Sequence, residues 1–149
     1  MIDELLQNTY DNFEFIGFAC LGIIFFFLLS RLSGWWAFAQ HYPSRPHKII
    51  EKWYLRSIWI GFLFAYENCV TLKITDQGLH LSLIFIFRIG HPPLLVPWEE
   101  IHVEKYKGWL TEYAKLTLRQ VPQTPIYFSK SLALEINEQR GGDWETALQ

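Results

Sequence analysis

Histidines are the side chains of this sequence best suited to metal binding or proton transfer. His80, His91 and His102 recur eleven residues apart along the chain. Protein metal sites usually draw ligands from short pairs such as His-x-x-His or Cys-x-x-Cys, and the sequence contains neither pair. The glycine-rich patterns that hold nucleotide phosphates are absent as well. We therefore predict no metal site and no cofactor, and we interpret His91 as a turn residue that bonds backbone groups.

Carboxylates and hydroxyls do not form a catalytic pattern either. Glu99 and Glu100 are adjacent, so on a strand they point to opposite faces and cannot act as an acid–base pair. Ser129 lacks the G-x-S-x-G surroundings of a nucleophile and fits a helix cap. Arg88 is predicted to pair with Glu99 or Glu100, or to face a partner or anionic lipid. The sequence predicts no enzyme, and a small membrane-bound enzyme using His91, Arg88 and Glu99 is kept as an alternative.

The composition predicts one domain with an appendage. The chain has 149 residues, of which 50% are hydrophobic, 17% aromatic and 19% charged. Ordinary soluble domains carry roughly 25% charged residues, and the low charge excludes a disordered chain and a nucleic-acid-binding arm. Cys20 and Cys69 cannot build a disulfide scaffold. We expect no nucleic-acid partner, and the sequence identifies no small-molecule substrate.

The apolar excess is concentrated near the N-terminus. Residues 15–30 read FIGFACLGIIFFFLLS and carry no charge. With their neighbours they approach the ~20 residues that a helix needs to cross ~30 Å of hydrocarbon. We therefore predict a transmembrane helix over residues 13–34, after an N-terminal tail of residues 1–12. The alternatives are a buried core helix, which should show a polar stripe, and a signal peptide cleaved at residues 37–39, which should begin with basic residues.

Flanking charge predicts the orientation of this helix. Residues 1–30 hold four acids and no base, a charge of −4, whereas residues 31–149 hold 13 bases and 11 acids, a charge of +2. The positive-inside bias then predicts an N-terminus outside the cell and a cytoplasmic remainder, in a single-pass protein. Arg31, Trp35 and Trp36 are expected at the membrane interface, where arginine snorkels and tryptophan forms an aromatic belt.

The rest of the chain is predicted to form a β domain. A juxtamembrane connector over residues 35–50 leads to this domain at residues 51–140, and a tail follows at residues 141–149. Alternating apolar residues, with turn residues between them, are typical of short antiparallel strands. Strands beyond the first hairpin are expected at residues 94–96, 99–106, 115–120 and 125–128.

One hairpin and one helix are the clearest local patterns. Residues 69–75 and 79–87 alternate with a period of two and are separated by a turn in which Gly78 suits a positive φ. A helix over residues 129–139 should stop at Gly141. The predicted fold class is α+β: an N-terminal transmembrane helix, then a mainly antiparallel barrel or sandwich with a C-terminal helix.

Two stretches of the sequence resemble known proteins. VTLKITDQGLHLSL, followed by LLVPWEEI, resembles bacterial PH-like domains, in which a turn-Gly-Leu hairpin precedes an apolar-Pro-Trp-x-x-Ile strand. SGWW followed by GLHLSLIFIFRIGHPPLLVPWEEI is similar to a family of small uncharacterised bacterial membrane proteins, over about residues 33–104. The resemblance implies a PH-like domain at the bacterial inner (plasma) membrane, with a binding role and no catalytic residue.

The loop that holds phosphoinositides in PH domains differs here. The corresponding residues 61–68, GFLFAYEN, are apolar with one acid and no base, so head-group recognition is not implied. We expect Phe62, Phe64 and Tyr66 either to contact lipid or a partner helix, or to fill the core. A second span over residues 58–66 is an alternative topology, opposed by its short length and by the charges that follow.

These patterns predict a membrane-anchored, non-enzymatic binding or scaffolding protein, whose PH-like domain holds a protein partner or membrane complex at the bilayer. The alternative is a lipid-surface sensor that uses the apolar loop at residues 62–66. The loop at residues 106–110, which contains Trp109 and follows Lys105 with Lys107 inside it, is expected to rest on lipid head groups or RNA, or to pack at the barrel rim. The candidate binding residues are Phe62, Phe64, Tyr66, Arg88, His91, Trp98 and Trp109.

Overall fold

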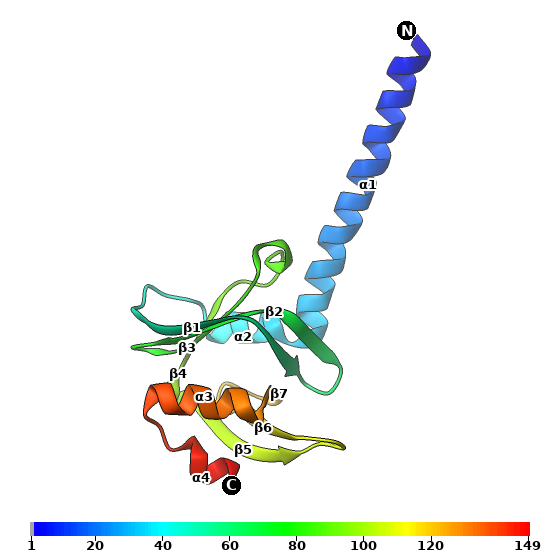
Figure 1. Cartoon of the computed structure of the whole chain (residues 1–149). Coiled ribbons are helices and arrows are strands. Elements are labelled where there is room, and N and C mark those ends of the chain that lie inside the picture. The colour runs from blue at the N-terminus through cyan, green and yellow to red at the C-terminus, as the bar shows by residue number, and fades with distance from the viewer. Residues whose placement is uncertain (1) are drawn as a thin grey trace.

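Figure 1 shows a long helix that leads from the N-terminus into a β domain. The computed structural model describes residues 2–149, and for several residues near the N-terminus, Asp3, Glu4 and Asp11 among them, it describes only the backbone. Helix α1 spans Ile2–Ser33. It therefore begins well before residue 13, the start predicted from the sequence. Residue 1 and three of the four acidic side chains used to predict orientation lie outside what the structure describes; the fourth, Glu14, is exposed on α1.

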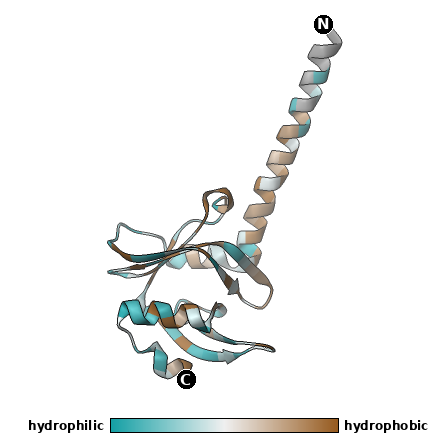
Figure 2. Cartoon of the chain, viewed as in Figure 1, coloured by the Kyte–Doolittle hydropathy of each residue, from teal (hydrophilic) through white to brown (hydrophobic). Residues whose placement is uncertain are grey.

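The part of α1 nearest the domain is long and apolar enough to cross a membrane. Its 22 residues Asn12–Ser33 are 6% buried over their most apolar stretch, and at ~1.5 Å per residue they extend about 33 Å. Side chains such as Phe15 and Phe18 are 75% and 73% exposed. Figure 2 shows this half of α1 in the hydrophobic colour. A buried core helix, one of the alternatives from the sequence, does not describe α1.

A glycine separates α1 from the short helix α2, Trp35–His41. Gly34 has a φ of 88°, in the left-handed region that favours glycine. A Cβ on Gly34 would lie 2.7 Å from the Thr124 side chain. The chain can therefore change direction close to the sheet, and α2 buries Trp35 and Phe38 in the core. The segment expected as a connector thus begins as a packed helix.

The β domain is one antiparallel sheet of seven strands in the order β4-β3-β2-β1-β7-β6-β5. Figure 1 shows the strands in two layers, and β1 extends from one layer towards the other. With the helices, the sheet confirms the predicted α+β class. The strands are β1 Ile49–Ile60, β2 Phe64–Thr75, β3 Gly78–Leu83, β4 Leu94–Pro97, β5 Ile101–Lys107, β6 Glu112–Leu118 and β7 Val121–Ser129.

A bend in β1 lets this strand take part in both layers. The pairing of β1 with β2 shifts register on either side of Arg56, and Leu55 has a φ of 52°. Such bulges bend a strand and increase its twist. Beyond the bend, Trp59 and Ile60 pair with Tyr127 and Ile126 of β7 as well as with β2. The second span proposed for this region is instead the hairpin of β1 and β2.

Two C-terminal helices complete the core. Helix α3, Lys130–Arg140, is capped by the Ser129 hydroxyl, which accepts from the Leu132 N–H, and ends at Gly141 with a φ of 69°. This confirms the predicted cap and stop. Helix α4, Trp144–Leu148, occupies the segment expected as a tail, and its two terminal side chains lie in the hydrophobic core. Apolar residues of α3 fill the space between β2 and the β6–β7 layer.

The predicted strand over residues 79–87 is correct only in its first half. β4 begins only at Leu94, opposite Leu81, and the pairing with β2 ends at Val70 and Leu83, followed by one bond from the Ile84 N–H to the Cys69 carbonyl. Beyond Ile84 the chain is not paired with either strand. The backbone there must find local partners. It forms a 3₁₀ turn, η1, at Phe85–Phe87, with the Phe87 N–H bonded to the Ile84 carbonyl at 2.9 Å.

Two smaller predictions also need correction. Gly78 does not have a positive φ; glycine is needed there because a Cβ would lie 2.0 Å from the Val96 carbonyl oxygen on β4. Glu99 and Glu100 do not lie on a strand, because Trp98–Glu100 forms a second 3₁₀ turn, η2, before β5 begins at Ile101.

Candidate functional site

A buried chain of polar groups joins the end of α1 to the sheet. The Ser33 hydroxyl lies 2.7 Å from the Tyr66 hydroxyl on β2, which lies 2.9 Å from Nε2 of His91. All three residues are buried, and His91 is 0% exposed. Buried polar groups need such partners because an unpaired one costs free energy. Tyr66 and His91, both expected as binding residues, thus meet in the interior.

The partners of His91 fix its tautomer. Its Nδ1 lies 3.0 Å from the Ile89 carbonyl oxygen, which can only accept, so Nδ1 carries the proton. Nε2 therefore accepts from Tyr66, whose hydroxyl accepts in turn from Ser33. Burial lowers the pKa of His91, and burial raises the pKa of Tyr66 to about 12, so both are neutral. Each ring nitrogen of His91 has a protein partner, which fits a structural role and confirms the predicted backbone bond.

Trp35 covers this polar chain. Its ring lies 5.5 Å from the rings of both Tyr66 and His91, and its Nε1 donates to the Pro92 carbonyl at 2.9 Å. The sequence predicted Trp35 at the membrane interface, but the residue is 0% exposed and belongs to the core. The sequence could not distinguish the two positions because an apolar indole with one donor suits both.

The other two residues expected at the interface lie together at the end of α1. The Arg31 guanidinium stacks 4.6 Å from the centre of the Trp36 ring. Arg31 is exposed and Trp36 is half-buried. This cation–π pair occupies the level at which the apolar part of α1 ends.

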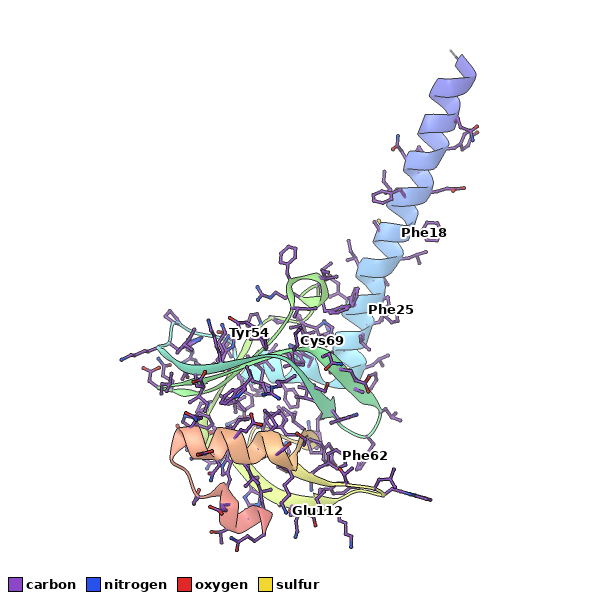
Figure 3. All side chains as sticks on the ribbon, viewed as in Figure 1. Phe18, Phe25, Tyr54, Phe62, Cys69 and Glu112 are labelled. Atoms are coloured by element: carbon purple, nitrogen blue, oxygen red, sulfur yellow. The ribbon has the colours of Figure 1, made fainter. Side chains whose placement is uncertain are left out.

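An apolar cavity lies between α1 and the domain. It has a volume of about 310 Å³, and Figure 3 labels two of its lining residues, Phe25 on α1 and Cys69 on β2. Its remaining apolar wall consists of Phe26, Leu29, Phe64, Ala65, Leu83 and Phe87. Tyr66, Glu67 and His91 form its polar edge. Apolar cavities with a few polar groups at one side are the usual form of small-ligand sites.

The loop that carries η1 closes this cavity on the other side. The Phe87 ring packs 5.6 Å from the Phe26 ring of α1, while Phe85 and Ile86 are 82% and 67% exposed. Arg88 was predicted to pair with Glu99 or Glu100, and this is wrong. Its Nε donates to the Leu83 carbonyl at 2.9 Å, at the base of the loop.

A second apolar and mostly aromatic surface lies on the β5–β7 side of the domain. We call Trp59, Phe62, Tyr106, Trp109, Leu110, Tyr113 and Tyr127 the aromatic face. Phe62, Tyr106, Trp109 and Leu110 are exposed, Trp59 and Tyr113 are half-buried, and Tyr127 is buried beneath them. Tyr127 is its centre, with its ring 5.1 Å from Tyr106 and 6.2 Å from Phe62. Five of these side chains line a shallow groove of about 190 Å³.

The tip of the β5–β6 hairpin extends this face into solvent. Trp109 is 98% exposed and Leu110 is 87% exposed. Trp109 was expected as a binding residue, whereas Leu110 was missed. The signal for Leu110 was its position in a glycine-containing turn, where no sheet neighbour can cover it.

The apolar loop expected at residues 62–66 is divided by the structure. Phe62 and Leu63 form the turn between β1 and β2 and are 82% and 86% exposed. Phe64 and Tyr66 lie on β2, Phe64 half-buried and Tyr66 6% exposed. Both alternatives for this loop therefore apply in part. Phe62 is free to contact lipid or a partner, whereas Phe64 and Tyr66 pack in the domain.

Trp98 has a packing role. Its ring lies 6.1 Å from the Trp144 ring of α4, and the Arg140 guanidinium stacks 4.7 Å from its centre. Its Nε1 donates to the Thr75 carbonyl at 3.4 Å. These contacts hold α4 against the sheet.

The three regularly spaced histidines do not meet. His80 is buried on β3, His91 follows η1, and His102 is exposed on β5. Among the side chains that the structure describes, no group of three His, Cys, Asp or Glu is placed to hold a metal ion. The three candidates for an enzyme do not share a site. His91 bonds to Tyr66 and Ile89, Arg88 bonds to the Leu83 carbonyl, and Glu99 lies in η2.

Comparison with protein-family models, with curated proteins and with solved structures finds no match for this chain. The fold class and the surfaces described above therefore rest on the sequence and structure of this chain alone.

Proposed function

We propose that this protein is a membrane-anchored, non-enzymatic binding and scaffolding module that holds a protein partner at the bilayer surface. The observation that carries the proposal is the aromatic face, with Trp109 98% exposed at its tip. Tryptophan and tyrosine are enriched in protein–protein interfaces and dominate their binding energy. Large exposed apolar surfaces mark interaction sites in soluble domains.

The position of the aromatic face fits a partner held near a membrane. Figure 1 shows β5 and β6 on the side of the domain opposite to the N-terminal part of α1. With α1 in a bilayer, Trp109 and Leu110 on this hairpin face the aqueous phase. A protein partner there is accessible from solution, and the domain would keep it within reach of the membrane.

Membrane anchoring is proposed on the exposure of α1. Its residues Asn12–Ser33 are long and apolar enough to span and are almost uncovered. Each Å² of such surface left in water costs about 25 cal/mol, so lipid is its natural surrounding. We propose a single pass through a bacterial inner membrane, with the N-terminus outside and a cytoplasmic domain of PH-like type. The charge asymmetry, the seven strands with a C-terminal helix and the sequence resemblance support these assignments.

The non-enzymatic part of the proposal is supported by the way the polar side chains are used. His91 is bonded to Tyr66 and to a backbone carbonyl, and Arg88 to another carbonyl. Groups committed to protein partners in this way are not free to act as acids, bases or nucleophiles.

The test compares two pairs of exposed apolar residues in the full chain. After crosslinking in cells and purification in mild detergent, the wild-type chain should recover one protein in a fixed ratio. Trp109→Ser with Leu110→Ser should lose that protein. Phe85→Ser with Ile86→Ser, which removes comparable exposed apolar surface from the η1 loop, should keep it. Recovery of the free chain alone, or equal recovery by both variants, would overturn the proposal.

Lipid-surface sensing through the β1–β2 turn is the second candidate. The observation that favours it is the exposure of Phe62 and Leu63 beside the end of α1, where both line a pocket with Arg31 and Leu32. Phe62→Ser with Leu63→Ser should then change how the reconstituted chain responds to lipid composition. A response identical to that of the wild type would rule this function out.

A further inference from the structure

We infer that the η1 loop is a second membrane-contact element, which inserts Phe85 and Ile86 among the acyl chains beside α1 and sets Arg88 at anionic head groups. The inference rests on one part of the proposed function, the position of α1 in a bilayer. It adds a contact that the apolar helix alone does not imply.

The depth of the loop follows from its contacts with α1. The Phe87 ring lies 5.6 Å from the Phe26 ring, and a Cβ on Gly90 would lie 3.1 Å from the Phe27 Cα. The helix ends at Ser33, about seven residues and thus about 10 Å beyond these contacts. The loop is therefore level with the apolar part of α1. Figure 1 shows the loop projecting from the sheet along α1, and Figure 2 shows it in the hydrophobic colour.

The two side chains at the tip have no protein surface to cover them. Phe85 is 82% exposed and Ile86 is 67% exposed, although Phe87 between α1 and the sheet is half-buried. Phe87 thus attaches the loop to the helix, and Phe85 and Ile86 point away from the protein. Such a pair gains free energy on entering hydrocarbon, at about 25 cal/mol for each Å² removed from water.

Part of the backbone of the loop is satisfied within the protein, as an apolar surrounding favours. The N–H groups of Phe87, Arg88 and His91 bond to the carbonyls of Ile84, Phe85 and Arg88 at 2.9, 3.3 and 2.9 Å. Irregular backbone at membrane depth is tolerated only where its polar groups are satisfied within the protein. The Arg88 Nε bond to Leu83 adds a partner at the end of β3, where the sheet ladder stops.

Positive charge beside the loop points to anionic lipid. Arg88 is exposed, and the bond of its Nε to the Leu83 carbonyl turns its side chain back towards the base of the loop. Arg31 is exposed at the end of the apolar part of α1. Basic residues near an anionic leaflet are attracted to its surface. An apolar tip with an adjacent arginine is the pattern expected of a segment that enters the interface.

The test measures the depth of single fluorescent labels in the full chain. Cys20 is replaced by Ala, while Cys69 stays, because it is buried and burial raises the pKa of its thiol. Single cysteines at the positions of Phe18, Ile86 and Trp109 are labelled with a nitrobenzoxadiazole dye. The proteins are reconstituted into phosphatidylcholine–phosphatidylglycerol vesicles with doxyl-labelled phosphatidylcholine as quencher.

The expected result is strong quenching at positions 18 and 86, several-fold above that at position 109. Trp109 is the matched control because it is even more exposed than Ile86 but lies across the domain. Quenching at position 18 with none beyond the control at position 86 would overturn the inference and leave the anchor in place. Absence of quenching at position 18 would overturn the anchor and the inference together.

The lipid charge is tested in the same system. Omitting phosphatidylglycerol should weaken quenching at position 86 in the chain with Arg88, and Arg88→Gln should abolish this difference. Arg119→Gln is the control, because Arg119 is 65% exposed and pairs with Glu100 on the β5–β6 side. Equal sensitivity to phosphatidylglycerol in all three proteins would refute the role of Arg88.

Discussion

The hydroxyls of Ser33 and Tyr66 lie 2.7 Å apart and join the last turn of α1 to the second strand of the sheet. Helix and domain are thereby connected by a buried hydrogen bond as well as by the chain. His91 extends the connection to the η1 loop, since its Nε2 accepts from Tyr66 at 2.9 Å. The segment most suited to the membrane and the domain form one packed unit.

Removing the Tyr66 hydroxyl should weaken this connection. Tyr66→Phe leaves His91 Nε2 without its buried partner and Ser33 with only its 3.4 Å bonds to the Ser30 carbonyl and the Trp35 N–H. The expected loss is about 1–3 kcal/mol in the free energy of unfolding. Denaturant unfolding of the full chain in micelles measures it. Tyr54→Phe is the matched control, because Tyr54 is 58% exposed, and should change stability by less than about 0.5 kcal/mol. An equal effect of the two substitutions would show that the buried bond is not important for stability.

Acidification should destabilise the domain through His80. This residue is 4% exposed with its Nδ1 unpaired, and burial, followed by the charges of Lys73, His47 and Arg88, lowers its pKa from 6.5 to about 4. The unfolded chain therefore binds the proton first. The free energy of unfolding should be highest above pH 6.5 and fall as the pH drops towards 4, by about 3 kcal/mol from this group. His91, whose pKa burial also lowers, acts in the same direction.

The contribution of His80 can be isolated by substitution. His80→Leu removes the proton-binding group and the unpaired nitrogen, so the variant should lose less stability than the wild type between pH 6.5 and 4. His102→Leu, on the exposed surface of β5, should leave the pH dependence unchanged. An unaltered pH profile in His80→Leu would assign the effect to other groups.

Gly78 should tolerate no side chain. A Cβ at this position would lie 2.0 Å from the Val96 carbonyl oxygen, so β3 and β4 must separate in Gly78→Ala. Overpacking of this kind typically costs about 1–3 kcal/mol, which thermal unfolding would reveal. Gly17→Ala is the control, since nothing lies within 4 Å of its added Cβ. Unchanged stability in Gly78→Ala would mean that the strands approach less closely.

The two cysteines should report on the surroundings of α1. Cys20 is exposed on the helix and Cys69 is buried with a raised thiol pKa. In reconstituted vesicles an apolar maleimide should label Cys20, and a charged maleimide should label neither cysteine until the protein is denatured. Mass spectrometry of the labelled chain measures this. Rapid labelling of Cys20 by the charged reagent would place it in water and contradict a span.

Local patterns predicted much of this fold. The alternation of apolar residues in β2 and β3, the cap at Ser129 and the glycine stop at Gly141 act over a few residues, and each was confirmed. The length and apolar character of α1 were equally visible, although the helix extends further towards the N-terminus than the apolar pattern indicated.

Features that depend on distant partners were not visible in the sequence. Residues 84–87 continue the apolar alternation of β3, but the pairing of β3 with β2 ends at Leu83 and its pairing with β4 ends at Leu81, and only the tertiary structure shows this. One signal was present, since both faces of the segment become apolar at Ile84 and Ile86, which a half-exposed strand would not favour. Trp35 was misplaced for the same reason, because its partners Tyr66 and Pro92 lie far along the chain.

The aromatic face contains one residue that a local pattern indicated and others that depend on distant partners. Trp109 was visible because it lies in a glycine-containing turn just after two lysines, whereas Trp59, Tyr113 and Tyr127 come from three different strands. Their meeting depends on the order β1-β7-β6-β5, which no local pattern encodes.

The fixed junction at Ser33 has a mechanical consequence. Helices in bilayers tilt more as the hydrocarbon layer becomes thinner, and a domain on a flexible tether would not follow. Here the Ser33–Tyr66 bond and the Phe26–Phe87 contact make the domain follow the helix. With α1 in a bilayer, as proposed, a change in bilayer thickness would move Trp109, across the domain, nearer to or further from the lipid surface.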